Sequence, residues 1–213
     1  MTAKKLQVRP SFYVFWSIFC LLDSENILPL FLCAAVLHEL GHIIVIYACG
    51  GCVQCIELSA VGAVIRQRRN LGYTADCMIA LAGPASGILC AWILSIMGFP
   101  MAAGANIMLS LFNCLPILPL DGGCALYSFL CIVFHVKTDM IDRICMAISF
   151  ILSFLITVFG GILLVYTARN ATVLIAGLLL LSVNASLLHG TTDYGMMNWK
   201  SYCTSIEKRW KQR

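Results

Sequence analysis

The chain has 213 residues, of which 61% are hydrophobic and 11% are charged, and its mean hydropathy is +0.91. Soluble domains carry roughly 25% charged residues, so this composition excludes an ordinary soluble enzyme and indicates an integral membrane protein. The net charge of +4 indicates little by itself, and no nucleic-acid partner is expected for a membrane protein of this composition.

Two apolar segments open the chain. The first is short, from about Pro10 to Leu22, and Pro10 suits the first turn of a helix. Basic residues precede this segment and acidic residues follow it, without a small-residue cleavage site, so we expect it to be retained as a membrane span. The second segment runs from about Ile27 to Cys49, and the two glycines after it should end its helix.

The second segment contains the sequence His38-Glu39-Leu40-Gly41-His42. Two histidines four residues apart lie on one face of a helix, so both rings can bind a single metal ion. Glu39 lies beside that ion without having to bind it, as in sites where a carboxylate takes a proton from a zinc-bound water. A buried structural cluster is less favoured, because each charge in lipid costs roughly 2.5 kcal/mol or more.

The stretch that follows the second segment differs from its surroundings. Side chains alternate in polarity from Val53 to Ser59, Gly62 interrupts the pattern, and a short apolar run leads to basic residues. This predicts a β-hairpin between Cys52 and Arg69 at the membrane surface. Strand backbone at membrane depth needs protein or water beside it, so we expect the hairpin to pack near the histidines.

A third span is predicted from about Thr74 to Phe99, and it contains the small-residue run from Ala82 to Gly87. Small residues allow helices to approach closely, and Pro84 should kink the helix. We therefore predict a packing notch in this span, in preference to a chemical role.

The fourth apolar segment is interrupted. Helical stretches are expected from about Ala102 to Leu115 and from about Ala125 to His135, and two prolines, Asp121 and two glycines lie between them. Prolines break the backbone hydrogen-bond ladder, and a carboxylate at the break of a membrane helix indicates a functional cavity.

Two further spans, from about Ile144 to Ala168 and from about Thr172 to His189, bring the expected number to six. Six crossings place 13 of the 14 lysines and arginines on one side, with Arg169 alone on the other. The positive-inside rule then places both termini in the cytosol.

The predicted fold class is an all-α membrane protein. We expect a polytopic bundle of about six transmembrane helices, with a small membrane-associated β-hairpin between the second and the third. Residues 1–189 should form the core, and residues 190–213 a short basic cytosolic tail on the bilayer surface.

A hydrolytic zinc site has three protein ligands and a fourth position for water. The third ligand should be a histidine or carboxylate within the membrane, and the candidates are Asp76, Asp121, His135 and His189. Asp76 is typical of a charge in the first turn of a helix, and the two histidines are more typical of helix ends at the interface. Asp121 is preferred, because it alone is an acidic residue in the middle of a membrane-buried element.

Two motifs in this chain resemble the signatures of the site-2 protease family, the zinc intramembrane metalloproteases. They are HELGH, at residues 38–42, and NCLPILPLDGG, at residues 113–123. The resemblance implies that His38, His42 and Asp121 bind zinc and that Glu39 is the general base. It also implies that Asn113 lies near the metal and helps to position the substrate or to stabilise the oxyanion.

The resemblance implies a zinc-dependent endopeptidase that cleaves a membrane-embedded or membrane-associated protein in the bacterial cytoplasmic membrane. Residues 6–12 and the small core look like the sporulation type, which releases a sigma factor from its pro-sequence, and a membrane-protein inhibitor or regulator is a further expected partner. The alternatives are a metal-ion transporter that uses the same ligands and an inactive, substrate-holding relative. Transporters favour paired repeats and several acidic residues along a path, and the sequence shows neither.

Overall fold

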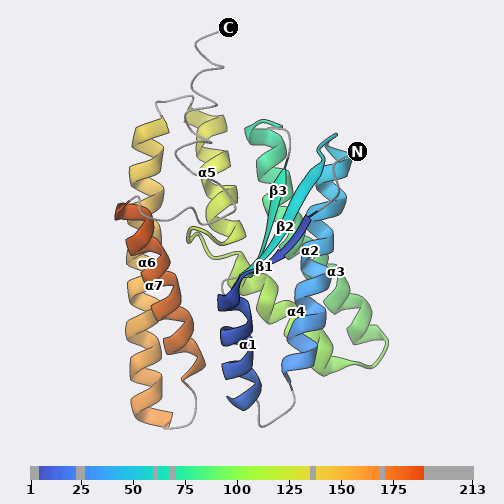
Figure 1. Cartoon of the computed structure of the whole chain (residues 1–213), viewed down its shortest axis with the longest axis vertical. Coiled ribbons are helices and arrows are strands. Elements are labelled where there is room, and N and C mark those ends of the chain that lie inside the picture. Colours follow the sequence, from blue (N-terminus) through green and yellow to red (C-terminus); the bar gives the residue numbers. More distant parts are fainter. Residues whose placement is uncertain are drawn as a thin grey trace, which may run out of the picture.

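The structure is a computed structural model that describes residues 5–22, 27–59, 62–67, 71–134, 138–167 and 171–189. Seven helices and three strands follow one another in these residues (Figure 1). They are β1 (Lys5–Val8), α1 (Pro10–Leu22), α2 (Leu28–Ala48), β2 (Val53–Ser59), β3 (Gly62–Gln67), α3 (Tyr73–Ile96), α4 (Pro100–Asn113), α5 (Asp121–Phe134), α6 (Thr138–Thr167) and α7 (Thr172–His189).

Within the described residues, three helical segments are long and apolar enough to cross a bilayer: Leu28–Ala48, Tyr73–Ile96 and Met140–Tyr166. They correspond to the second, third and fifth predicted spans, and the all-α membrane architecture is confirmed. Helix α6 begins at Thr138, before the predicted start of the fifth span at about Ile144. Its first turns are more polar than the rest, since a helix can continue beyond the apolar segment into the aqueous boundary.

The interrupted fourth segment consists of two short helices. Helices α4 and α5 have 14 residues each, and at 1.5 Å per residue neither spans a hydrocarbon core about 30 Å thick. Residues 114–120 join them, and α4 lies in the lower half and α5 in the upper half of Figure 1. The predicted break is therefore present, and its loop leads directly into Asp121.

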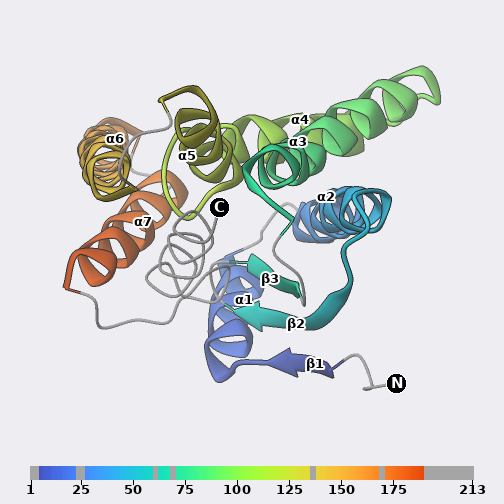
Figure 2. The same ribbon diagram turned by 90° about the horizontal axis from the view of Figure 1, so that it is seen from above.

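The predicted hairpin is confirmed as strands β2 and β3, which are antiparallel. The structure adds strand β1, which pairs in parallel with β2 in the register Lys5 to Cys55 and Val8 to Leu58. Figure 2 shows β1 outermost and β3 on the side of the helices. A four-residue strand is too short to show a recognisable alternation, so the sequence pattern does not reveal it.

Arg9, which follows strand β1, forms a hydrogen bond and an ion pair with strand β2. Its backbone N–H donates to the carbonyl oxygen of Leu58 at 2.9 Å, and its guanidinium group pairs with the carboxylate of Glu57. Glu57 is buried, whereas the Arg9 side chain is 40% exposed. The pair therefore contributes to neutralising a carboxylate that the sheet buries.

Small residues bring helices α2, α3 and α4 close together. A Cβ atom added at Gly41 would lie 2.3 Å from the Ser86 hydroxyl, and one added at Gly87 would lie 2.2 Å from the Ser110 hydroxyl. The packing notch predicted for residues 82–87 is thus present, in a helix that continues through Pro84. Viewed from above, α5 lies between the α3–α4 side and the α6–α7 pair (Figure 2).

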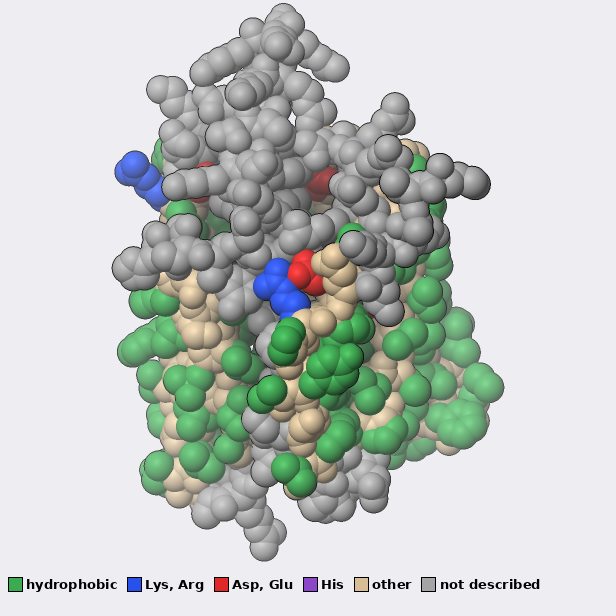
Figure 3. Space-filling model, in the orientation of Figure 1, with side chains coloured by type: hydrophobic (Ala, Val, Ile, Leu, Met, Phe, Trp, Pro, Cys, Tyr) green, Lys and Arg blue, Asp and Glu red, His purple; other side chains and the backbone are tan. Residues whose placement is uncertain are grey.

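The outer surface suits a lipid environment. Figure 3 shows hydrophobic side chains over the lower part of one face, while the charged side chains drawn there lie at or above mid-height. Large apolar side chains point outward from the long helices, including Val36, Trp92 and Phe154, which are 60%, 64% and 53% exposed. The helices that are long enough to span a membrane, α2, α3 and α6, thus also carry apolar side chains on their outer surface.

Candidate metal centre

Helix α2 provides two neighbouring imidazole rings. His38 and His42 lie one helical turn apart, and each residue is buried, at 4% and 5% exposure. The ring centroids are 5.0 Å apart, and the two Nε2 atoms are 3.3 Å apart. The four-residue spacing therefore turns both nitrogens toward one point.

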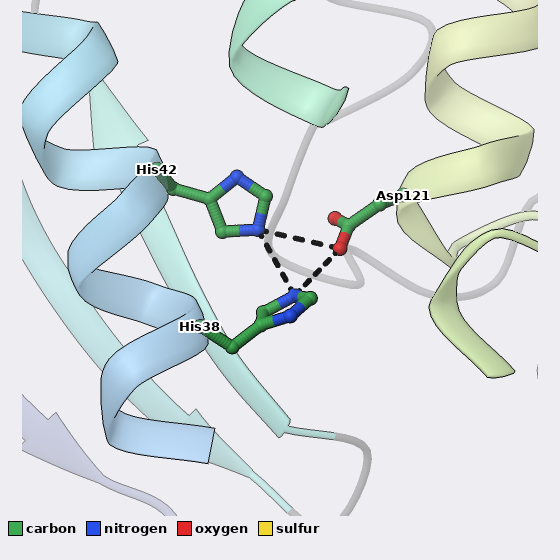
Figure 4. Close-up of side chains that lie close together, drawn as sticks. All are labelled: His38, His42 and Asp121. Atoms are coloured by element: carbon green, nitrogen blue, oxygen red, sulfur yellow. Dashed lines mark hydrogen bonds and ion pairs between the residues drawn. The ribbon is translucent and has the colours of Figure 1, made fainter. Parts of the chain in front are cut away.

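Asp121, the first residue of α5, supplies the third group. The loop before it brings this buried carboxylate to the histidines, although Asp121 and His42 are 79 positions apart in the sequence. Its Oδ2 atom lies 2.8 Å from Nε2 of His38 and 3.3 Å from Nε2 of His42 (Figure 4). One carboxylate oxygen and two imidazole nitrogens thus form a compact triangle.

The dimensions of this triangle fit a metal ion. Zinc–ligand distances of about 2.0–2.2 Å in a tetrahedron separate neighbouring ligand atoms by about 3.3–3.6 Å. Two edges of the triangle measure 3.3 Å, and the 2.8 Å edge needs only a small opening. His38, His42 and Asp121 therefore form a group that can hold one metal ion and leave a fourth position open.

A hydrogen bond to helix α3 orients the His42 ring in the triangle. Its Nδ1 atom lies 2.7 Å from the backbone carbonyl oxygen of Ile79 in α3. A carbonyl oxygen can only accept, so Nδ1 carries the proton and Nε2 of the neutral ring presents a lone pair. Nε2 is then the atom that faces the Asp121 carboxylate, and a histidine held in this way by a backbone carbonyl is typical of metal sites.

Gly83 of α3 forms one wall of the site. A Cβ atom at this position would lie 2.3 Å from Nε2 of His42 and 2.6 Å from Nε2 of His38. The small-residue run was predicted to serve packing in preference to chemistry, and its contact with the two rings was missed. The available signal was a glycine next to a proline in a span that must pack near the histidines.

Glu39 lies outside the triangle, and its role as general base stays a prediction. It follows His38 on α2 and is half-buried, and its Oε2 atom is buried without a hydrogen-bond partner among the described residues. A carboxylate oxygen in this state is free to accept a proton from a neighbouring water molecule.

The remaining predicted residues lie apart from the triangle or outside the described residues. Asn113 is the last residue of α4, and its side-chain amide donates to the Leu109 carbonyl at 3.0 Å within the same helix. Its proposed role stays a prediction. Asp76 lies in the first turn of α3, as expected. His135 and the side chain of His189 lie outside the described residues.

Comparison with known proteins adds two relatives, although no family model matches the chain. A candidate zinc metalloprotease of Synechocystis sp. is 37% identical over 109 residues, which are 45% of this chain. That match spans 28% of the Synechocystis protein, less than a third of its length.

The second relative is a solved structure, the site-2 protease from Methanocaldococcus jannaschii. It superposes with a TM-score of 0.66 at 22% sequence identity, and covers 85% of this chain and 89% of its own. The chain therefore has the fold of a site-2 protease, and the resemblance predicted from its two motifs is confirmed at the level of the fold.

Proposed function

We propose that this protein is a zinc-dependent intramembrane endopeptidase. The observation that carries the proposal is the buried group of His38, His42 and Asp121 within a helical membrane fold. A zinc ion held there would polarise a peptide carbonyl and lower the pKa of a bound water to about 7. The names of the two relatives support the same chemistry.

Glu39 would carry the proton in this reaction. Its Oε2 atom, which has no hydrogen-bond partner among the described residues, would accept the proton of the attacking water and then deliver it to the leaving amine nitrogen. Asn113 would donate its amide N–H to the developing oxyanion or to the substrate backbone. For this, Asn113 has to exchange its hydrogen bond with the Leu109 carbonyl for one with the substrate.

Strand β3 would hold the substrate. A helical substrate hides its carbonyl groups in its own hydrogen bonds, so it must unwind before hydrolysis. In the described part of the sheet, β2 has a neighbour on both sides, whereas β3 has one only. The open edge of β3 can pair with an extended segment, and deletion of residues 61–65 should then weaken cleavage. Unchanged cleavage by the deletion variant would exclude edge pairing.

The expected substrate is a membrane-embedded or membrane-associated protein of the bacterial cytoplasmic membrane. A pro-sigma factor of sporulation is the preferred candidate, supported by the resemblance of residues 6–12 to that type of protease. The distribution of basic residues supports cytosolic termini. A membrane-protein inhibitor or regulator would complete such a system.

A metal-ion transporter is less well supported. In the residues that the structure describes, His38, His42 and Asp121 form one metal-binding group, without a second group that could continue a path. Ion pathways through membranes use successive polar or ionisable sites. The single buried group favours catalysis.

The proposal can be tested with the purified full-length chain in vesicles. Metal analysis should find one zinc ion per chain, and a co-reconstituted single-span reporter bearing a sporulation pro-sequence should be cleaved. Chelation should stop cleavage, and added zinc should restore it. Purified, folded protein without stoichiometric metal would exclude the proposal.

A further inference from the structure

Helices α6 and α7 contribute no ligand to the metal group, yet their buried polar side chains converge on the loop before Asp121. Ser149 and Ser153 on α6 are 1% and 0% exposed, and Asn184 on α7 is 2% exposed. Buried polar groups at membrane depth are costly unless they are hydrogen-bonded, so their partners indicate their role.

Two of these side chains form hydrogen bonds with the backbone N–H and the backbone carbonyl of one loop residue, Leu118. The Leu118 backbone N–H donates to the Ser149 hydroxyl at 2.8 Å, and the Asn184 side-chain amide donates to the Leu118 carbonyl oxygen at 2.9 Å. The Ser149 hydroxyl in turn donates to the Cys145 carbonyl at 2.7 Å, and the Asn184 amide lies 3.2 Å from the Ser153 hydroxyl. One residue of α6 and one residue of α7 thus fix the position of the Leu118 backbone.

The loop depends on such outside partners. Pro116 and Pro119 have no backbone N–H, so the loop cannot form a regular hydrogen-bond ladder of its own. Its internal bonds are two short turns, from Ile117 to Leu115 and from Leu120 to Ile117. The polar groups of Leu118 would otherwise be buried without partners, because no water is available in the hydrocarbon layer.

The loop is also packed tightly against the start of α5. A Cβ atom at Gly122 would lie 2.2 Å from the Cys114 carbonyl oxygen, and one at Gly123 would lie 2.7 Å from the Leu118 nitrogen. Leu118 and Asp121 are three residues apart, and the Cys124 N–H bonds back to the Leu120 carbonyl at 3.0 Å. A displacement of Leu118 would therefore move the carboxylate of Asp121.

We propose that Asn184 and Ser149 are positioning residues that hold Asp121 at the histidine pair. The metal affinity of the site then depends on helices that do not touch the metal. The inference rests on the proposed function, because it assumes that the triangle binds zinc.

The test compares zinc affinity in the full-length chain, measured by competition with a chelator in detergent. Asn184→Leu removes the amide donor at similar size, and Ser149→Ala removes the hydroxyl. Each should weaken zinc binding about tenfold, at the lower end of the effect of removing an outer hydrogen-bond partner of a metal ligand. Thr157→Val is the matched control, since the Thr157 hydroxyl donates to the backbone carbonyl of Ser153 in its own helix, α6. Its zinc affinity should be unchanged.

A double variant separates positioning from general stability. In an Asp121→Asn background, the residual zinc affinity should be insensitive to Asn184→Leu, because the residue that it positions has lost its ligand oxygen. Thermal unfolding of the metal-free proteins reports any loss of stability separately. If Asn184→Leu does not fold, Ser149→Ala carries the test, because it removes a single hydroxyl.

The possible failures are distinguishable. If the original chain binds zinc and both single variants bind it equally well, the positioning role is overturned and the proposed function stands. If Thr157→Val weakens zinc binding as much as they do, the effect is general and the positioning role is also overturned. If the original chain binds no zinc, the proposed function fails, and this inference fails with it.

Discussion

The Nδ1 atom of His42 lies 2.7 Å from the backbone carbonyl oxygen of Ile79, so helix α3 fixes the ring of a histidine on helix α2. Gly83 lies one turn after Ile79 on α3, and its missing side chain leaves room for the Nε2 edges of both rings. A single face of α3 therefore orients one candidate ligand and leaves the space that both ligands need.

Gly83→Ala should weaken zinc binding at least tenfold, about the effect of disturbing an outer hydrogen-bond partner of a ligand. The added methyl group would lie 2.3 Å from Nε2 of His42, so the ring must turn away. Chelator competition measures the loss. Gly104→Ala on α4 is the control, because no atom lies within 4 Å of its added Cβ. Equal zinc affinity in both variants would contradict the assignment of Gly83 to the site wall.

Glu39→Gln should keep one zinc ion per chain and lower the cleavage rate by roughly 10²–10⁴-fold, the usual contribution of a general base. The amide keeps the size of the side chain but cannot accept the proton. Metal analysis and reporter cleavage measure the two effects. A variant that lost its zinc would identify Glu39 as a ligand instead of a base.

Asp121→Asn should weaken zinc binding more than Gly83→Ala does, because a neutral amide oxygen replaces a charged ligand. We expect a loss beyond the roughly 10–100-fold cost of removing an outer partner. Asp76→Asn is the matched control, since Asp76 lies in the first turn of α3 and is outside the metal group. Zinc binding that survives Asp121→Asn unchanged would exclude Asp121 as the third ligand.

Asn113→Ala should reduce kcat by about 10²–10³-fold, as the loss of an oxyanion donor does in other hydrolases, and leave zinc affinity unchanged. In the structure its amide donates only within α4, so a purely structural role would lower the unfolding temperature and spare kcat. Steady-state cleavage and thermal unfolding separate these two outcomes.

Arg9→Met should lower stability by about 1–2 kcal/mol, toward the lower part of the range for a hydrogen bond to a charged group, because the Arg9 side chain is 40% exposed. The variant leaves the Glu57 carboxylate buried without this partner. Thermal unfolding measures the change, and Arg143→Met at an exposed position of α6 is the control. Similar unfolding temperatures for both variants would show that the pair does not stabilise the sheet.

Several features of this protein follow from local patterns along the chain. The four-residue spacing of His38 and His42 makes them neighbours on any helix, whatever surrounds it. The two prolines before Asp121 must interrupt a helix, because they lack an N–H wherever they occur. Long apolar runs and the alternation from Val53 to Ser59 predict the membrane helices and the hairpin for the same reason.

Other features depend on contacts between distant parts of the chain, which leave no periodic pattern. Strand β1 exists because its four residues meet the edge of β2, about fifty positions later. The room at Gly83 and the two bonds on Leu118 depend on how α3, α6 and α7 pack. The sequence by itself determined the helices, the break and the types of candidate ligand, since these follow from short-range sterics and hydrophobicity. Only the tertiary structure decided that the Asp121 oxygen meets both imidazoles, because that distance results from the packing of the whole bundle.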